Sequence, residues 1–357
     1  MKQEIPLLTE QDVLIRLTSR TDLYSPLEIR AVKPRPSTAD RGFDARITLS
    51  WGGHIVPFVV KVKARTAPKL VSEAVWRLKS CAGDRKWNLL LVVPFLSKTI
   101  VEILEREGMS GLDLNGNYLI HTPEMVAIRL DRRNEFTESQ PIKKIFSGGS
   151  SLVGRLFLSG PRRFGSVNEV YSSIRELGGS LSLSAVSKVL AGLENELIIE
   201  KGRDGISLLQ PGKLLQSLED GYRPPKVTAT MKLKLPGTGL SAIQELAKSM
   251  PAAQWVLSGE SSAQRHAVTT TAETFIVYAT DLEPPGLISS LARFEDERFF
   301  NVTMKSISDT FPCFDTRTGE GVPWASPVQC YLELSQLGKR EREIAATVRE
   351  AILSKLK

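Results

Sequence analysis

Acidic and basic residues around a predicted hairpin form the first group that could do chemistry. Asp44 opens one strand-like run, and Lys61 and Lys63 end the next. Two carboxylates can hold a divalent metal, and a lysine can stabilise the negative charge on an attacked phosphate. Lys61 stands where the second carboxylate would lie, and a cation there repels Mg²⁺. Glu73, on the following helix, is the substitute carboxylate that this chemistry would need.

Three interpretations of this group remain open. The layout resembles the restriction-endonuclease-like fold, whose motif is an aspartate followed across a hairpin by Glu-x-Lys. In the first interpretation, Asp44, Glu73 and Lys63 form a metal-dependent nuclease. In the second, the domain is an inactive relative, and Lys61, Lys63 and Arg65 contact DNA phosphates without cleaving. In the third, Asp44 caps or pairs at a strand end while the lysines face solvent.

The segment Ser166–Leu209 has a pattern typical of a winged helix-turn-helix. Two segments with helical periodicity, each with one apolar face, flank Gly178-Gly179. They are followed by a short hairpin, which turns at Asp204-Gly205. A helix that reads the DNA major groove, about 12 Å wide, needs a small, polar or basic outer face. The second helical phrase has such a face, made of Ser184, Ser187, Lys188 and Ala191.

This segment therefore predicts contacts with double-stranded DNA. Ser182 or Ser184 caps the second helix, where free N–H groups also suit a phosphate. The predicted DNA-contacting residues are Arg162, Arg163, Ser182, Ser184, Ser187, Lys188, Lys201 and Arg203. The alternative is a winged helix used for protein contacts, because nearby acidic residues almost cancel the local positive charge. These are Glu194, Glu196, Glu200 and Asp204.

Other candidate sites lack the partner residues that their chemistry requires. The Ser258-Gly259-Glu260 run stands before a predicted helix, as in a nucleotidyltransferase loop, but the following strand 274–279 has no acidic residue inside it for metal binding. Asp113, Asn115 and Asn117 around Gly116 predict a turn rather than a metal loop. The histidines fall in no recognisable catalytic motif, and we expect no cofactor. They are His54, His121 and His266.

Length, charge and cysteine content limit the class of protein. A chain of 357 residues predicts two or three domains at about 150 residues each. The net charge of +7 favours a polyanionic partner, although the charge is spread along the chain. Three scattered cysteines, a charged N-terminus and no apolar run of the ~20 residues that span a membrane predict a cytoplasmic protein without a membrane partner.

Periodicity and linker composition predict three domains of α/β and α+β class. Residues 1–145 read as a mixed sheet flanked by helices, residues 146–222 as the winged unit, and residues 223–357 as an α+β domain. The predicted helices are 10–18, 68–81, 98–107, 151–158, the two winged-helix phrases, 241–249, 285–294 and 339–356. The predicted strands are 27–34, 44–51, 54–63, 88–95, 116–121, the 198–209 hairpin, 254–258, 274–279, 301–306 and 328–333.

Three phrases carry a resemblance to a known family: SLSLSAVSKVLAGLENELIIEKGRDG, WVLSGESSAQRH and SPVQCYLELSQLGKREREIAATVREAIL. They resemble the type IV toxin–antitoxin antitoxins of the abortive-infection kind, the AbiEi-like transcriptional regulators. The resemblance covers roughly residues 151–353, with the nuclease-like domain in front as in longer members. It implies a repressor, often encoded beside a nucleotidyltransferase-like toxin, whose C-terminal domain is a catalytically silent nucleotidyltransferase-like fold. Of the family's functional residues, the resemblance assigns only those of the winged helix to this chain, as a surface that contacts DNA.

The sequence thus predicts a DNA-binding transcriptional repressor that is not an enzyme. Its expected partners are double-stranded DNA, a nucleotidyltransferase-like toxin and a second copy of the chain. A dimer would bind half-sites about one helical turn, or a multiple of it, apart. Two alternatives stay open: a Mg²⁺-dependent nuclease that uses the first domain, and an antitoxin that binds only protein.

Overall fold

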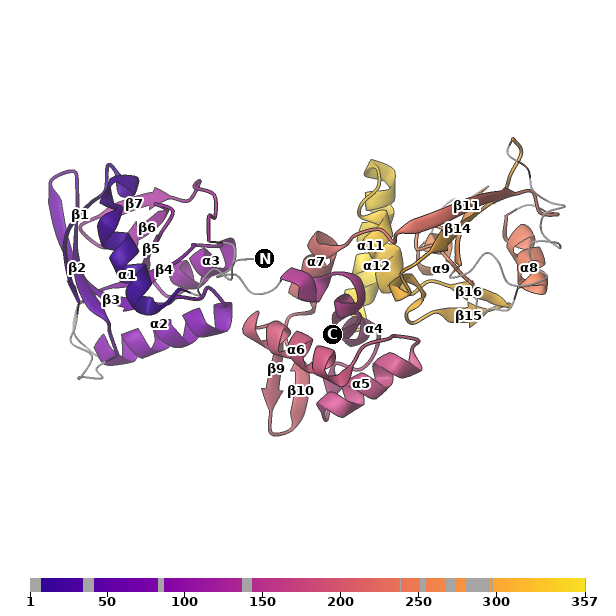
Figure 1. The fold of residues 1–357 in the computed structure, drawn as a ribbon, viewed down its shortest axis with the longest axis horizontal. Helices are drawn as coiled ribbons and strands as arrows, with labels where there is room; N and C mark the ends of the chain where they lie inside the picture. The colour runs from indigo at the N-terminus through magenta and orange to yellow at the C-terminus, as the bar shows by residue number, and fades with distance from the viewer. Residues whose placement is uncertain are drawn as a thin grey trace, which may run out of the picture. The chain divides into compact units, whose positions relative to one another are not determined.

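The computed structural model describes residues 8–34, 42–82, 87–136, 143–237, 239–250, 255–267, 274–279, 296 and 298–356. They form a mixed α/β structure with a curled mixed sheet and several helices (Figure 1). The chain divides into two compact units. The first comprises Met1–Ile142 with Asn195–Leu197, and the second comprises Lys143–Glu194 with Ile198–Lys357.

The first unit is built on a seven-stranded sheet whose strands lie in chain order. Strands β3, β4 and β5 are parallel to one another, and the other neighbours are antiparallel. Helices α2 and α3 make the crossovers that parallel strands require. The elements are α1 (Glu10–Ser19), η1 (Thr21–Tyr24), β1 (Glu28–Pro34), β2 (Ala45–Trp51), β3 (His54–Val62), α2 (Pro68–Ala82), β4 (Asn88–Val93), α3 (Lys98–Arg106), β5 (Ser110–Asp113), β6 (Tyr118–His121) and β7 (Val126–Arg129).

Successive side chains along the central strands point to opposite faces of this sheet, which explains how both faces are covered. Val60 and Val62 of β3 pack in one apolar cluster with residues of α1, whereas Val59 packs in another with α2 and α3. Leu90 and Leu91 of β4 divide between the same two clusters. A strand buried on both faces reads as a continuous apolar run, which is why β4 is conspicuous in the sequence.

The second unit begins with helices and a small sheet. Strands β8, β10 and β9 pair antiparallel in that order, and α4 is buried along its length. Gly178, after α5, has φ +83°, a backbone conformation that favours glycine. The elements are η3 (Lys143–Phe146), η4 (Gly148–Ser150), α4 (Ser151–Ser159), β8 (Arg163–Phe164), α5 (Val167–Glu176), α6 (Leu183–Asn195), β9 (Ile199–Gly202), β10 (Gly205–Leu208) and α7 (Pro211–Gly221).

The rest of the second unit is a four-stranded sheet, in the order β11-β14-β13-β12, with helices. Apolar side chains of α4 and α7 share one core with those of α11 and α12, so residues on both sides of the expected boundary at 222 pack together. The elements are β11 (Val227–Leu233), α8 (Leu240–Ser249), β12 (Trp255–Leu257), α9 (Ala263–His266), β13 (Phe275–Ala279), β14 (Val302–Ile307), η7 (Phe311–Cys313), β15 (Arg317–Gly319), β16 (Val322–Trp324), α11 (Pro327–Leu334) and α12 (Lys339–Ser354).

The structure corrects one predicted strand and shows elements that the sequence did not predict. Residues 328–333 belong to helix α11, whose start is set by Pro327 and by the Ser326 hydroxyl, which accepts the Gln329 N–H at 3.2 Å. Periodicity failed there because α11 is buried on all sides. The unpredicted elements are β5, β7, β8, α7, β11, β15 and β16, together with the short 3₁₀ helices η1, η3, η4 and η7. The predicted helix 285–294 lies outside the described residues.

Candidate nucleic-acid interface

Helix α6 presents one narrow polar face to solvent. Its apolar residues Val186, Val189, Leu190 and Leu193 are buried, whereas Leu183 in its first turn, expected on the buried face, is exposed. The opposite positions are exposed and recur at the helical spacing of three and four residues, so they form one stripe. The stripe consists of Ser184, Ser187, Lys188 and Ala191.

The first turn of α6 resolves which serine caps the helix. The Ser182 hydroxyl accepts the N–H of Ala185 at 3.2 Å, so Ser182 is the cap and Ser184 remains on the exposed stripe. The first N–H groups of a helix have no partner within the helix and carry partial positive charge. This end of α6 therefore favours a phosphate oxygen.

The hairpin after α6 ends in a tip of two residues. Because Gly202 pairs with Gly205, the tip is Arg203-Asp204, one residue earlier than predicted. Figure 1 shows the β9–β10 hairpin extending from the end of α6. Arg163 of β8 donates through Nε to the Asp204 carbonyl at 2.9 Å and lies 3.8 Å from its carboxylate. Arg163 therefore holds the tip in place.

The five predicted DNA-contacting cations differ in their ion pairs. Lys201 lies 3.8 Å from the Glu194 carboxylate, and Arg163 is engaged at the hairpin tip. The other three cations are exposed and, within the residues that the structure describes, form no ion pair. These three are Arg162, Lys188 and Arg203. They lie before α5, on α6 and on the hairpin tip, so each segment contributes one available positive charge.

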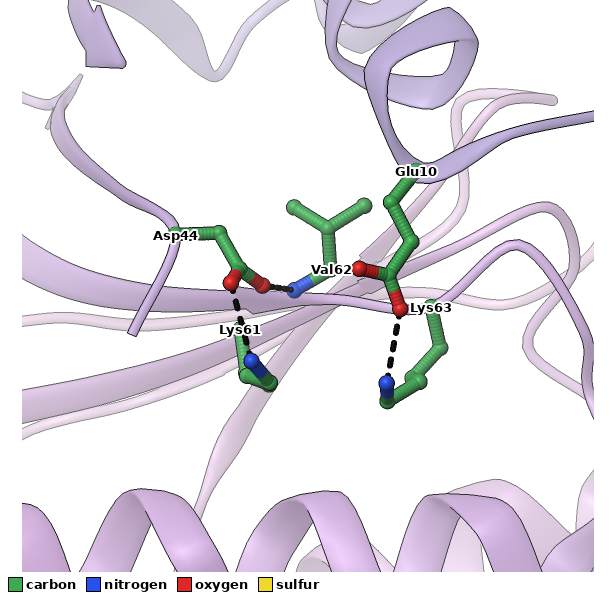
Figure 2. Close-up of polar contacts among 5 residues, drawn as sticks. All are labelled: Glu10, Asp44, Lys61, Val62 and Lys63. Carbon is green, nitrogen blue, oxygen red and sulfur yellow. Dashed lines mark hydrogen bonds and ion pairs between the residues drawn. The ribbon is translucent and has the colours of Figure 1, made fainter. Parts of the chain in front are cut away.

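The second predicted group lies at the ends of β2 and β3 in the first unit (Figure 2). Asp44 accepts from Lys61 Nζ at 2.8 Å through Oδ1 and from the Val62 N–H at 2.6 Å through Oδ2. Lys63 Nζ instead donates to Glu10 Oε1 at 2.6 Å. Figure 2 shows the two lysine–carboxylate pairs on either side of Val62. Each lysine in this group is therefore neutralised by its own carboxylate.

This geometry departs from the predicted nuclease set. Glu73 is exposed on α2, and in the described part of the chain no ion pair joins it to Lys61 or Lys63. Glu10 is the carboxylate that sequence reasoning missed; its pairing with Lys63 spans 53 residues, and no short motif signals it. The ammonium of Lys61 beside Asp44 opposes binding of a divalent cation through like-charge repulsion. Among the described residues, no group of three or more His, Cys, Asp or Glu side chains could hold a metal ion.

The predicted turn around Gly116 is confirmed. The Asp113 carboxylate accepts the N–H groups of Leu96, Asn115 and Asn117 at 3.0, 2.8 and 2.9 Å, and the Asn117 side-chain amide at 2.7 Å. Gly116 has φ +90°. Burial raises the pKa of Asp113, against hydrogen bonds that lower it. This carboxylate acts in folding, as the hub of the turn.

The Ser258-Gly259-Glu260 loop packs against helix α11. Gly259 lies so close to the backbone of Gln329 that an added Cβ would stand 2.6 Å from the Gln329 carbonyl oxygen. Gln329 accepts from buried Arg155 at 2.5 Å and donates to Glu333 at 2.6 Å. Burial raises the pKa values of both Glu333 and Glu260. Ser258 and Gly259 are therefore buried beside a polar network of protein groups, which a sequence motif does not show, whereas Glu260 is exposed.

Comparison with family models, with curated proteins and with solved structures found no match for this chain. None of the described helices is long and apolar enough to cross a membrane.

Proposed function

We propose that this chain is a DNA-binding transcriptional repressor, and that residues 146–222 act as a winged helix-turn-helix. In this proposal α5 and α6 are the paired helices, and the β8-β10-β9 sheet is the wing. The observation that carries the proposal is the exposed stripe of α6, which is small, polar and basic and begins at a capped N-terminus. Such a helix fits the major groove.

The role of each residue follows from its place in this arrangement. Ser184, Ser187 and Lys188 face base edges, because the first turns of a recognition helix enter the groove. Arg203 at the hairpin tip contacts the phosphate backbone or the minor groove, and Arg162 contacts phosphate before α5. Arg163 and Lys201 support the wing, since Arg163 pairs with Asp204 at its tip and Lys201 pairs with Glu194 of α6.

The two flanking regions are proposed as silent relatives of catalytic folds. The three parallel strands and two crossover helices of the first unit are compatible with a restriction-endonuclease-like domain, and the Lys61–Asp44 pair favours an inactive one. The C-terminal region is proposed as nucleotidyltransferase-like and silent. In this scheme the protein is cytoplasmic, dimeric on DNA, and the antitoxin partner of a nucleotidyltransferase-like toxin.

The proposal is tested by fluorescence anisotropy with a duplex taken from upstream of the chain's own gene, at low salt and in EDTA. Lys188→Gln/Arg203→Gln should weaken binding by roughly tenfold or more and reduce the slope of log K against log salt. The matched control, Lys339→Gln/Arg342→Gln, removes the same two positive charges from exposed positions of α12 and should bind like the parent. Equal affinities for all three proteins would contradict the proposed interface.

The same duplex tests the nuclease alternative. Incubation with Mg²⁺ or Mn²⁺ should leave the DNA intact, because the Asp44 carboxylate is occupied by Lys61. Metal-dependent cleavage that Asp44→Ala abolishes would overturn the proposal of an inactive first unit. Absence of any DNA affinity at low salt would favour the protein-binding antitoxin instead.

A further inference from the structure

The second unit contains a small cavity that neither the DNA interface nor the polar network uses. Its volume is about 210 Å³. The end of α4, the end of α9, strand β15 and helices α11 and α12 supply most of its walls.

Among the described residues, the charged side chains that line this cavity are all basic. Arg265, Arg317 and Lys355 line it together with His266. Burial lowers the pKa of His266, and the same three cations lower it further. All three positive charges are therefore close enough to His266 to affect its protonation. Asp315 lies 3.4 Å from Arg317 and offsets part of that charge. A cluster of like charges is relieved by an anion.

Two of these groups are held in position by the protein. The guanidinium of Arg265 lies over the ring of Trp324, 5.9 Å from its centroid. His266 Nε2 is 3.0 Å from the Ala325 carbonyl oxygen. Because the carbonyl can only accept, the neutral imidazole donates there, and its other nitrogen is an acceptor. The cations rather than His266 therefore provide the attraction for an anion.

Part of the cavity lining is apolar. Leu158, Val328 and Ile352 are buried there, and they can cover the carbon part of a ligand. Ser159 also lines the cavity, and its hydroxyl has no hydrogen-bond partner among the described residues, although it is buried.

We propose that this cavity binds a small phosphate monoester. The dianionic phosphate lies among Arg265, Arg317 and Lys355, where guanidinium groups can form paired hydrogen bonds with its oxygens. The carbon portion lies against the apolar part of the lining. The volume is below the roughly 300–1,000 Å³ of drug-sized sites, so the ligand has the size of a sugar phosphate rather than a dinucleotide.

Isothermal titration calorimetry on the full chain tests the proposal, with ribose 5-phosphate as the probe. We expect saturable binding of ribose 5-phosphate, weaker binding of inorganic phosphate, and no binding of ribose. No heat with ribose 5-phosphate at millimolar concentrations would overturn the proposal. Equal affinity for inorganic phosphate would overturn the monoester assignment, because the apolar part of the lining would then contribute nothing.

Variants locate the binding. Arg265→Gln/Lys355→Gln should weaken ribose 5-phosphate at least roughly tenfold, because two charge-assisted contacts are lost. Lys339→Gln/Arg342→Gln, with the same change in net charge outside the cavity, should leave the affinity unchanged. Ala351→Phe keeps every charge but fills the cavity, and it should abolish binding while the circular dichroism spectrum stays that of the parent. Equal weakening by the control, or full affinity in Ala351→Phe, would place the binding elsewhere.

Discussion

The two groups of basic residues that stand out in this sequence use their charge differently. At the ends of β2 and β3, Lys61 and Lys63 each lie within 2.8 Å of a carboxylate, so each positive charge is neutralised by an ion pair within the protein. Around α6, Arg162, Lys188 and Arg203 are exposed and form no ion pair among the described residues. A basic residue signals a nucleic-acid partner only where its charge is available, and pairing decides that.

The carboxylates show the same contrast. In the first unit, Asp44 binds a lysine and a backbone N–H, and Asp113 gathers three backbone N–H groups. Near α6, Asp204 is exposed at the hairpin tip, where its carbonyl and its carboxylate contact Arg163. Asp44 and Asp113 of the first unit therefore act in folding, which substitutions at Asp113 and Lys61 can test.

The largest effect is expected at Asp113. Asp113→Ala leaves three buried N–H groups without their acceptor, which should lower the free energy of unfolding of the first unit by about 3 kcal/mol. Hydrogen exchange of peptides covering β4 to β6 measures this locally. The control Asp131→Ala removes an exposed carboxylate and should leave exchange unchanged. Unchanged exchange in Asp113→Ala would show that the turn does not depend on its carboxylate.

A second substitution tests whether Lys61 keeps a metal away. Lys61→Glu replaces the ion pair with two like charges. The free energy of unfolding of the first unit, measured in EDTA, should therefore fall by about 2 kcal/mol. Mg²⁺ should raise the melting temperature of this variant, because a ligand that binds only the folded state stabilises it. Lys61→Gln removes the cation without adding a carboxylate, so Mg²⁺ should raise its melting temperature by less. The interpretation fails if Mg²⁺ has the same effect on Lys61→Glu as on the parent.

The smallest effect concerns His266 in the second unit. Its folded pKa lies below the unfolded value of about 6.5, so the unfolded state binds the proton more tightly. Stability should therefore fall as the pH drops below about 6.5 toward the folded pKa. Thermal unfolding between pH 7.5 and 5, roughly bracketing that window, should show a weaker pH dependence in His266→Gln. The exposed His54→Gln is the control, and a loss of pH dependence there instead would contradict the assignment.

How much the sequence could predict depended on the range of each interaction. The buried faces of α2 and α6 follow from helical spacing, and both helices lie where the pattern predicts them. Helix α11 was mistaken for a strand because burial on all sides removes the periodic signal. The Lys61–Asp44 and Lys63–Glu10 pairs span 17 and 53 residues, so no local pattern indicates that these lysines are neutralised.

The most direct test sets one lysine from each group against the other. Lys188→Gln and Lys61→Gln each remove one positive charge, and the dissociation constant of the upstream duplex is measured in EDTA over a range of salt. We expect Lys188→Gln to weaken binding by roughly tenfold and to reduce the salt slope by about one, while Lys61→Gln binds like the parent. A loss confined to Lys61→Gln, or equal in the two variants, would contradict the α6 interface.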